Sequence, residues 1–392
     1  MADLLVTAKH ALGLSLTFLT RMDGTTQHLE VVECSIPFLF KDGSSQPQQT
    51  SLCQAIRENK LPPVIPDVRA LPEAMKLPAA RFPRIRSFVS VPVVLSDGTV
   101  YGTFCGAGFT AEKGLTKRDK SLMDVLAHAA AVIIEPEVVE RSREAEIRAR
   151  FAPVVAGGGP VVVLQPIVEL ATGLPVGAEA LSRFPAEWAK APDVCFAEAH
   201  SIGLGDRLEL LALSGAAVHL PHMCGYVAMN VSPATLLTPA CTALLAALPL
   251  GRIVLELSEH DPVEDYDVLM AVLGPLRAQG MRLAIDDVGA GFSSLRHIVL
   301  TAPDVIKLDR SIVDGVSTDP VLTTLVGSLV DFGHGCGAHV VAEGIETAAD
   351  AAALLGLGVD YGQGWHFGRP GPPEALGKGT RMINVCLSRR RP

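Results

Sequence analysis

Short apolar runs recur along the chain from residue 161 onward, and each run ends in polar residues before apolar residues continue at helical spacing. Continuous apolar and β-branched runs of this length are typical of strands that are buried on both faces of a parallel sheet. We identify such runs at Val161–Leu164, Val176–Ala180, Tyr226–Met229, Ile253–Leu257, Arg282–Ile285, Val305–Leu308, Val340–Ala342 and near Gly362–Phe367. Strand–helix units repeated over about 240 residues predict an α/β fold of the (β/α)8 TIM-like barrel type.

Residues 1–135 carry a different pattern, in which strand-like stretches pair around turn residues and helical spacing lies at both ends. Asp23-Gly24 and Ser96-Asp97-Gly98 supply the turn chemistry of two hairpins. The expected strands are Leu14–Thr20 with His28–Cys34, and Ser87–Leu95 with Val100–Ala107. The order helix, strands, long loop, hairpin and helix predicts an α+β sandwich of the size of a small sensor domain.

The last helix of this region, Lys117–Ile134, is expected to end before Pro136. A charge-dense helical linker follows at residues 136–156, and the glycines after it open the second domain. We therefore predict a sensor domain at 1–135, the linker at 136–156, and a barrel domain with a short tail at 157–392. The linker fits a helix that pairs across a homodimer, which we favour, and it also fits a solvated single helix.

Composition and charge limit the partners that the chain can have. Its 392 residues are 48% hydrophobic with a formal net charge of −9, which favours folded domains and offers no basic surface for a long nucleic acid. No apolar stretch reaches the about 20 residues of a membrane span, and Asp3 ahead of the apolar segment at 11–20 argues against a signal peptide. We expect a cytoplasmic protein without membrane contact, and a solvated end at Arg389-Arg390-Arg391.

Eight cysteines are scattered along the chain without a Cys-x-x-Cys pair. A chain of this length needs no disulfides for stability, so we expect these residues to be reduced and mostly buried. Cys53 and Cys105 both lie in the sensor region and leave a redox or ligand role open. Small buried hydrophobic residues are the favoured interpretation of this pair.

The polar residues at the ends of the predicted barrel strands are mostly carboxylates. They are Glu179, Asn230, Glu256, Asp286, Asp287, Lys307, Asp309, Glu343, Glu346 and Gln363. Barrel enzymes place catalytic groups at these strand ends, and so many carboxylates at one mouth require a cation among them. Oxygen ligands without His or Cys favour Mg²⁺ or Mn²⁺, and two ions would suit the cleavage of a phosphoester.

Short motifs within residues 4–135 resemble a GAF domain. They are Ser51-Leu52-Cys53, Val64-Ile65-Pro66-Asp67, Phe88-Val89-Ser90-Val91-Pro92-Val93 and Tyr101-Gly102-Thr103-Phe104-Cys105-Gly106. The resemblance implies a sensor domain for a small ligand that the sequence does not name. A PAS-like module is the competing interpretation.

Ordered motifs over residues 151–375 resemble the EAL-domain phosphodiesterases. They are Gln165-Pro166-Ile167-Val168, Glu179-Ala180-Leu181 with Arg183, Asn230-Val231-Ser232, Glu256-Leu257-Ser258-Glu259, Asp286-Asp287, Lys307-Leu308-Asp309, Glu343-Gly344-Ile345-Glu346 and Gln363-Gly364 through Gly368-Arg369-Pro370. The resemblance implies hydrolysis of cyclic di-GMP to the linear dinucleotide pGpG under control of the sensor domain. A catalytically silent receptor for this nucleotide, and a ligand sensor with weak hydrolysis, are the alternatives.

The resemblance also implies a role for each matching residue. A first metal ion would be held by Glu179, Asn230, Glu256 and Asp286, and a second by Asp287. Glu343 would be a ligand or the general base, and Lys307 would position the attacking water or help to deprotonate it, so that Glu179, Lys307 and Glu343 form the catalytic set. The substrate would be bound by Gln165, Leu181, Arg183 and Gln363. Glu259 would anchor the loop that follows Asp286. Asp309 and Glu346 would support the metal ligands from behind, without contacting the metal ions.

The loop after Asp286 departs from the family pattern. Val288 stands where the family usually carries Phe, and Ala290 stands where Thr is common. An aromatic packing contact is therefore expected to be lost, which bears on the order of the second metal position.

Overall fold

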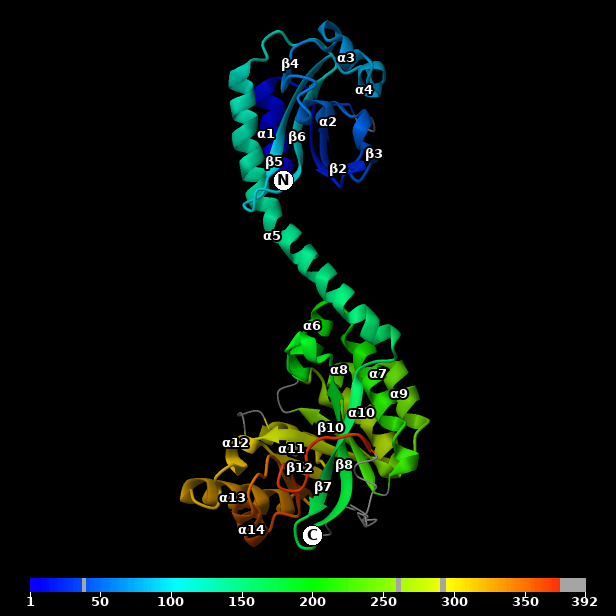
Figure 1. The fold of residues 1–392 in the computed structure, drawn as a ribbon, viewed down its shortest axis with the longest axis vertical. Coiled ribbons are helices and arrows are strands. Elements are labelled where there is room, and N and C mark those ends of the chain that lie inside the picture. The colour runs from blue at the N-terminus through cyan, green and yellow to red at the C-terminus, as the bar shows by residue number, and fades with distance from the viewer. Residues whose placement is uncertain (37–39, 224, 259–261, 290–293, 374–392) are drawn as a thin grey trace. The chain divides into compact units, whose positions relative to one another are not determined.

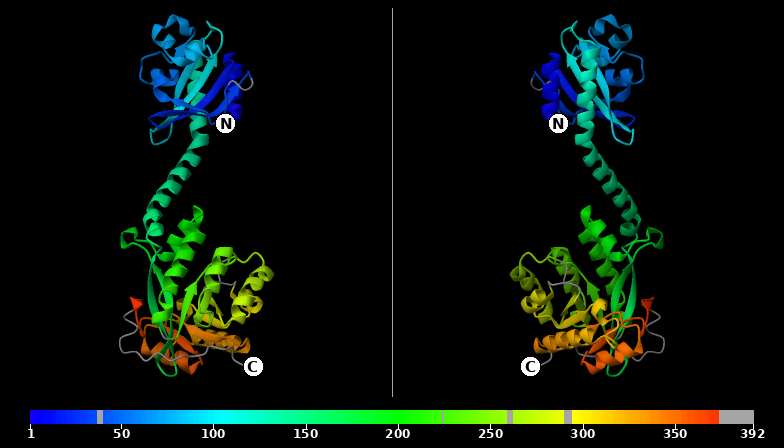
Figure 2. Two further views of the ribbon diagram at one scale, coloured as in Figure 1. Left: turned by 90° about the vertical axis from the view of Figure 1, so that its right-hand side faces the viewer. Right: turned by 90° about the vertical axis from the view of Figure 1, so that its left-hand side faces the viewer.

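The computed structural model of the chain describes residues 1–36, 40–223, 225–258, 262–289 and 294–373. The chain divides into two compact units, Met1–Arg143 and Glu144–Pro392 (Figure 1, Figure 2). The predictions made for Glu259, Ala290 and Arg389-Arg390-Arg391 fall outside the described residues.

The N-terminal unit is built on one antiparallel sheet of six strands in the order β3-β2-β1-β6-β5-β4. Its strands are β1 Leu16–Met22, β2 Thr26–Cys34, β3 Ser45–Pro47, β4 Val64–Ile65, β5 Ser87–Val94 and β6 Val100–Gly108. Its helices are α1 Ala2–Leu12, α2 Leu52–Arg57, α3 Pro72–Met75, α4 Pro78–Arg81 and the first part of α5 Lys117–Ala156. Both predicted hairpins are confirmed, because β1 pairs with β2 and β5 pairs with β6.

Alternation along the strands gives this sheet two buried faces, because successive side chains point to opposite sides. On one face, Phe104 of β6 belongs to an apolar cluster with Leu5 of α1 and Met123 of α5. On the other face, Cys105 belongs to a second apolar cluster with Leu52 of α2. Helices thus cover both faces of the sheet, and the predicted α+β sandwich is confirmed.

Helix α5 continues through Pro136 and ends only at Ala156, so the prediction that it stops before the proline is wrong. A proline inside a helix removes a hydrogen bond and clashes with the preceding turn, at a cost of about 3 kcal/mol or more. Apolar contacts hold the helix on both sides of this position, because Ile134 before it is buried in the cluster of Phe104 and Val138 after it packs against the same cluster. Burial of such side chains, at about 1.5–3 kcal/mol each, offsets the cost of the proline.

An apolar stripe lies on the exposed side of α5. Val125, Val132 and Val139 follow one another at intervals of seven residues and are 66%, 61% and 59% exposed. Side chains at this interval share one side of a helix and are typical of helices that pair. Pairing of two copies along α5 stays a prediction.

The C-terminal unit contains a closed barrel of eight strands in chain order from β7 to β14. Its strands are β7 Val161–Glu169, β8 Leu174–Arg183, β9 Tyr226–Asn230, β10 Ile253–Ser258, β11 Arg282–Val288, β12 Val305–Leu308, β13 His339–Ala342 and β14 Tyr361–Gln363. Its helices are α6 Pro192–Ser201, α7 Gly205–Ala217, α8 Pro233–Leu236, α9 Pro239–Ala246, α10 Tyr266–Ala278, α11 Ser294–Thr301, α12 Arg310–Val313, α13 Pro320–Gly335 and α14 Ala348–Gly356. Every predicted run coincides with or overlaps one of these strands, and the TIM-like barrel is confirmed.

The first barrel strand runs against its neighbours, since β7 is antiparallel to both β8 and β14. The expectation that each strand opens a strand–helix unit is therefore wrong for β7. The reason is the connection to β8, because residues 170–173 form a tight turn with Gly173 at φ 69°, whereas parallel strands need a crossover of about a dozen residues or more. The reversal places Gln165 of β7 opposite Glu179 of β8.

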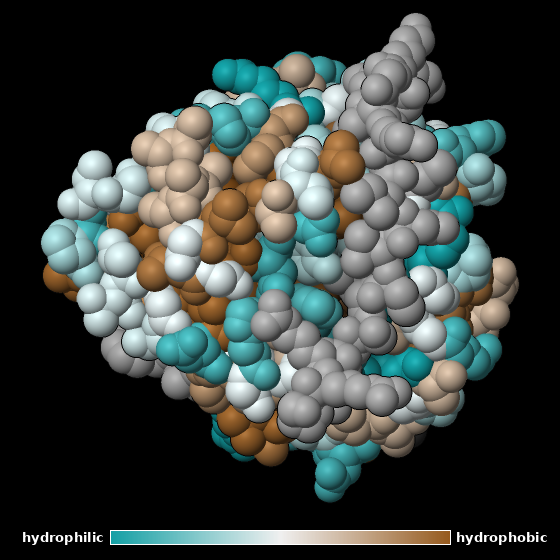
Figure 3. Space-filling view, turned by 90° about the horizontal axis from the view of Figure 1, so that it is seen from below, coloured by the Kyte–Doolittle hydropathy of each residue, from teal (hydrophilic) through white to brown (hydrophobic). Residues whose placement is uncertain are grey.

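In the described parts of the chain, no helix is both long enough and apolar enough to cross a bilayer. Individual apolar side chains of the barrel unit are exposed, among them Val299, Val321 and Leu355. On the face drawn in Figure 3, apolar side chains form patches that are interrupted by polar ones.

Candidate active site

The inward-facing positions change from apolar to polar along five of the barrel strands, β9 to β13. An apolar cluster of buried residues includes Ala228, Val254, Ala284, Val305 and Val341. Because alternate residues of a strand face the same side, the residues two positions further along face the same interior. These residues are Asn230, Glu256, Asp286, Lys307 and Glu343, in the same order. A polar layer therefore follows the apolar one at the carboxyl ends of the parallel strands, where barrel enzymes carry their active sites.

Lys307 is the centre of this polar layer and has a relative exposure of 1%. Its Nζ forms ion pairs with four carboxylates. The distances are 2.6 Å to Glu343 Oε1, 3.0 Å to Glu256 Oε2, 3.0 Å to Asp286 Oδ1 and 3.6 Å to Glu179 Oε2. One buried ammonium group thus faces four acidic groups, and the site carries an excess of negative charge.

This excess of negative charge shifts the protonation of the cluster. Burial, reinforced by the neighbouring carboxylates, raises the pKa of Glu256 and Glu343 well above the ordinary range although Lys307 opposes it. Burial also raises the pKa of Asp286. For Lys307 burial acts to lower the pKa, but the attraction of the carboxylates outweighs it and its pKa lies well above the usual value. A cation that binds the cluster therefore competes with protons for Glu256, Asp286 and Glu343.

Glu179 differs from the other carboxylates of the cluster. Burial acts to raise its pKa, but Lys307 and hydrogen bonds from Gln363 and Asn230 outweigh this effect, so its pKa is lowered. Gln363 Nε2 donates to Glu179 Oε2 at 2.7 Å, and Asn230 Nδ2 donates to Glu179 Oε1 at 2.9 Å. Gln363 Nε2 also donates to Gln165 Oε1 at 3.1 Å. These side-chain amides hold Glu179 in its charged form.

Two groups of carboxylates lie close enough to share a divalent cation. Oxygen atoms of Glu179, Glu256 and Asp286 lie within 4.8 Å of one another, and so do oxygen atoms of Asp286, Asp287 and Glu343. Carboxylate oxygens are the ligands that Mg²⁺ and Mn²⁺ prefer in proteins. The donor set fits hard divalent cations, which would neutralise the charge that Lys307 leaves uncompensated.

Asp287 joins the second group through a rare backbone conformation, with φ 58°. This left-handed region costs most residues about 1–2 kcal/mol, although aspartate tolerates it better than most. The N–H of Asp287 donates to Asp286 Oδ1 at 2.9 Å. Val288 follows in β11 and is buried beside Leu308, so this position packs into the barrel core without an aromatic ring. An effect of Val288 on the second metal position stays a prediction.

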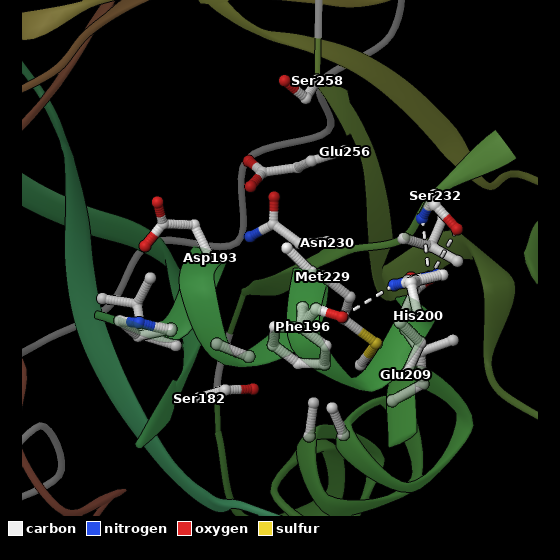
Figure 4. A pocket seen from close by; sticks show the side chains of 18 of the residues that line it. Ser182, Asp193, Phe196, His200, Glu209, Met229, Asn230, Ser232, Glu256 and Ser258 are labelled. Atoms are coloured by element: carbon white, nitrogen blue, oxygen red, sulfur yellow. Dashed lines mark hydrogen bonds and ion pairs between the residues drawn. The ribbon is translucent and has the colours of Figure 1, made fainter. Parts of the chain in front are cut away.

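A cleft of about 610 Å³ lies beside the carboxylates (Figure 4). Its polar lining includes Ser182, Arg183, Asp193, His200, Asn230, Glu256 and Asp287. Its apolar lining includes Leu181, Phe196, Leu213 and Met229. This volume lies within the about 300–1,000 Å³ that is usual for small-molecule sites, and the mixed lining suits a ligand with both flat apolar and charged parts.

The structure brings most of the predicted site residues to one end of the barrel. Lys307 and the predicted metal ligands lie together in the polar layer. Leu181 and Arg183 line the cleft. Gln363 donates to both Glu179 and Gln165, so these two glutamines lie beside Glu179. Asp309 and Glu346 have other partners. Asp309 Oδ1 accepts from Ser311 N at 2.9 Å as the cap of α12, and Glu346 Oε1 lies 2.8 Å from Arg310 Nη2. Among the described residues neither carboxylate contacts Lys307, and the roles of all these residues stay predictions.

Sequence reasoning missed a buried acidic residue in the cleft wall. Glu209 of α7 is 7% exposed, and its Oε2 accepts hydrogen bonds from Ser232 N at 2.8 Å and Ser232 Oγ at 2.9 Å. His200 Nε2 of α6 lies 3.1 Å from Glu209 Oε1. These contacts hold the segment that follows Asn230. Glu209 shares a helical face with Leu213, and a carboxylate on an apolar face was the signal in the sequence.

A TIM-like barrel with an acidic mouth and an adjoining cleft defines the class of protein, and comparisons with known proteins define the family. A family model described as EAL domain matches residues 148–370, and one described as GAF domain matches residues 3–135. The chain therefore belongs to the EAL domain family, whose members bind cyclic di-GMP or act as its phosphodiesterases, and it carries a GAF domain ahead of the barrel.

Individual relatives agree with this assignment. The chain is similar to an uncharacterized signaling protein of Caulobacter vibrioides, with 31% identity over 284 residues that cover 69% of the chain and 35% of the relative. An uncharacterized protein of Azorhizobium caulinodans is 32% identical over 231 residues, which cover 54% of the chain and 31% of that relative. The chain spans about a third of the length of these curated relatives. The solved PaMucR phosphodiesterase in complex with c-di-GMP is similar with a TM-score of 0.53 and 26% identity, over 59% of this chain and 99% of that one.

We expect Lys307→Met to destabilise the barrel unit in the absence of divalent cations. The variant leaves buried carboxylates without their ammonium partner, and the free energy of unfolding should fall by about 3–5 kcal/mol. Chemical denaturation with a chelator present measures this change. The control is Lys190→Met, which should change it by only about 0–1 kcal/mol because Glu198 keeps Arg150 as a partner. Equal unfolding free energies for both variants would refute the central position of Lys307.

Stabilisation by Mn²⁺ is expected to grow with pH. The raised pKa values of Glu256 and Glu343 mean that, without a cation, their stabilising contribution is complete below the ordinary carboxyl pKa and is lost as the pH rises through the raised values. A cation must displace the same protons, so its binding strengthens over this window. Thermal unfolding with and without Mn²⁺, at about pH 6 and about pH 8, should give the larger increase in Tm at the higher pH. A larger increase at the lower pH would contradict the protonated state of the cluster.

Proposed function

We propose that the C-terminal unit is a phosphodiesterase that hydrolyses one phosphodiester bond of cyclic di-GMP and releases the linear dinucleotide pGpG. We propose Mg²⁺ or Mn²⁺, in two positions, as its cofactor. The observation that carries the proposal is the set of carboxylates around Lys307 beside a cleft of about 610 Å³. Similarity to the PaMucR phosphodiesterase, whose structure holds c-di-GMP, supports the choice of nucleotide.

The residues that would hold the cations are the carboxylates of the cluster and one amide. Glu179, Asn230, Glu256 and Asp286 would hold one ion, and Asp287 would hold a second with Asp286. Asn230 is suited to this because its Nδ2 is used on Glu179, which leaves its oxygen as the ligand atom. When bound, such cations lower the pKa of a water molecule and offset the charge that builds on a phosphate.

The remaining chemistry falls to side chains of the chain itself. Glu343 is the candidate general base, because its carboxylate lies in the cluster beside Lys307 and its pKa is raised by burial, which makes it a stronger base than an exposed carboxylate. Lys307 lies 2.6 Å from Glu343 Oε1, so it orients this carboxylate and contributes positive charge beside the reacting phosphate. Arg183 is half-buried in the cleft wall, where its guanidinium can fork onto a phosphate oxygen. Leu181 and Phe196 offer apolar surface to a guanine base.

Purified protein of residues 1–392 with Mn²⁺ is expected to convert cyclic di-GMP into pGpG, measured by chromatography of the products. Glu343→Gln should reduce turnover about 10²–10⁴-fold, because the general base is lost, while the affinity for cyclic di-GMP in calorimetry changes little. Glu187→Gln removes an exposed carboxylate of the same unit and should leave turnover unchanged. Binding without turnover in the wild type would replace this proposal with the second candidate, a cyclic di-GMP receptor, which the Val288 position favours.

We also propose that the sensor acts on the cleft through the last turns of α5. Phe151 of α5 is fully buried, with its ring centroid 4.9 Å from that of Trp188 and 6.1 Å from that of Phe184. Phe184 in turn meets Phe196 of α6 edge-on at 5.5 Å, and Phe196 lines the cleft. Arg150 also pairs with Glu198 of α6. A shift of α5 would therefore reach the cleft wall through packed aromatic rings, which do not deform freely.

Phe151→Leu is expected to raise the KM for cyclic di-GMP about 2- to 12-fold, which corresponds to the about 0.5–1.5 kcal/mol that an aromatic pair contributes. Leucine keeps the site apolar, so the barrel should remain folded. Steady-state kinetics of the protein of residues 1–392 measure the effect. Phe332→Leu, in the apolar core of the same unit, is the control and should leave KM near the wild-type value. The same KM for both variants would remove the aromatic contacts as a route to the cleft.

A further inference from the structure

Two thiols of the N-terminal unit lie in contact although they are far apart in the chain. Cys53 is in α2 and Cys105 is in β6, and they are 2% and 0% exposed. Their Sγ atoms are 3.2 Å apart. Nothing in the chemistry of the barrel uses these residues, and the contact is closer than two apolar side chains would make. Both residues are buried in one apolar cluster, as the favoured interpretation from sequence expects, and the contact between their sulfurs is an additional feature.

The sheet register surrounds the two sulfurs with polar side chains. Ser90 of β5 lies opposite Cys105 in the ladder, and Thr20 of β1 lies opposite Thr103. Ser90 Oγ is 3.2 Å from Cys105 Sγ, Thr103 Oγ1 is 3.1 Å from it, and Thr20 Oγ1 is 2.8 Å from Thr103 Oγ1. All of these residues are buried on the face of the sheet that faces α2. A row of buried hydroxyl groups costs stability unless it has partners, and here the thiols are among the partners.

The surroundings make the two thiols chemically unequal. For Cys53 burial acts to raise the pKa, but hydrogen bonds from Cys105, Thr103 and Gln27 outweigh it and lower the pKa. For Cys105 burial, together with the neighbouring Cys53, raises the pKa well above the usual value. The thiolate is the reactive form of cysteine, so we take Cys53 as the nucleophile of the pair, an order that the variants below test.

We propose that Cys53 and Cys105 are a redox pair, which a small peroxide converts into a disulfide. The Sγ atoms need only approach from 3.2 Å to the about 2.05 Å of a disulfide bond. Burial restricts the oxidant, because the sulfurs are out of reach of a protein disulfide but hydrogen peroxide is about the size of a water molecule. The site thus belongs to the chemical class of peroxide-reactive dithiols.

The reaction balances with hydrogen peroxide as the oxidant. The Cys53 thiolate attacks one oxygen, the O–O bond breaks, and the departing hydroxide takes the proton of Cys105 to become water. The Cys105 thiolate then attacks the sulfur of the Cys53 sulfenic acid, the S–O bond breaks, and this hydroxide takes from solvent the proton that Cys53 released when it ionised. Two thiols and one peroxide give one disulfide and two waters, with one electron lost from each sulfur.

Tryptic mapping of the wild-type chain, residues 1–392, tests the pair directly. Cys53 lies in the peptide of residues 42–57 and Cys105 in the peptide of residues 87–113, and each peptide contains a single cysteine. After stoichiometric hydrogen peroxide we expect these peptides to be linked, two hydrogens lighter than their sum, and to separate again with dithiothreitol. The half-buried Cys34 and Cys336 serve as internal controls for unspecific oxidation. Oxidation of these controls while the two peptides stay unlinked would overturn the proposal.

Two variants test the order of the reaction. Cys105→Ala removes the resolving thiol, so dimedone should trap a sulfenic acid at Cys53. In Cys53→Ala, Cys105 should react about tenfold more slowly or not at all, because it lacks the thiolate character of Cys53. Cys241→Ala, which removes a single buried cysteine of the barrel unit, should behave as the wild type. Equal reactivity of Cys53 and Cys105 in the two variants would refute the assignment of the nucleophile.

The proposal is independent of the proposed activity of the barrel. Glu343→Gln protein should form the same disulfide at the same rate, because Glu343 lies in the other unit. Loss of hydrolysis and loss of disulfide formation are therefore separate results. A disulfide rate that changed with Glu343→Gln would count against a self-contained redox pair.

Discussion

The burial of Lys307 among four carboxylates is the interaction on which the barrel unit depends. A buried charge is tolerated only when it is paired, so strands from around the barrel must bring Glu179, Glu256, Asp286 and Glu343 to between 2.6 and 3.6 Å of one ammonium group. The apolar layer two residues earlier on most of these strands closes the barrel beneath them. Because one ammonium cannot balance four carboxylates, the same arrangement that needs Lys307 also attracts divalent cations.

Strand β7 and helix α5 are connected to the Lys307 cluster and its cleft in different ways. The antiparallel direction of β7 brings Gln165 beside Glu179, where it shares Gln363 as a hydrogen-bond partner. Helix α5 ends in the packed aromatic rings that reach Phe196 in the cleft wall. Buried polar groups are also paired in the sheet of the N-terminal unit. Its buried hydroxyl groups and thiols form hydrogen bonds with one another, most of them across neighbouring strands.

Much of the fold and of the candidate site could be predicted from the sequence, because both follow from short-range patterns. Continuous apolar runs marked the barrel strands, and the polar residues at their ends marked the cluster. The failures have a common cause, which is that a local rule was overridden by contacts elsewhere. Pro136 is a helix breaker by itself, yet α5 continues because Ile134 and Val138, on either side of it, pack against one apolar cluster. Glu209 lies on an apolar face of α7 and was missed, because its burial depends on Ser232 of a distant segment, whose backbone and side chain it holds.

The sequence by itself determined which elements form and which side chains share a face, because periods of two and of about 3.6 residues are properties of the local backbone. It also determined the chemistry available, namely an excess of carboxylates with one lysine at strand ends. Only the tertiary structure decided which of these groups meet. Lys307 and Glu256 are 51 residues apart in the chain, and Cys53 and Cys105 are 52 apart, yet each pair is in direct contact. Barrel closure and sheet register set those contacts, and both are properties of the whole fold rather than of any segment.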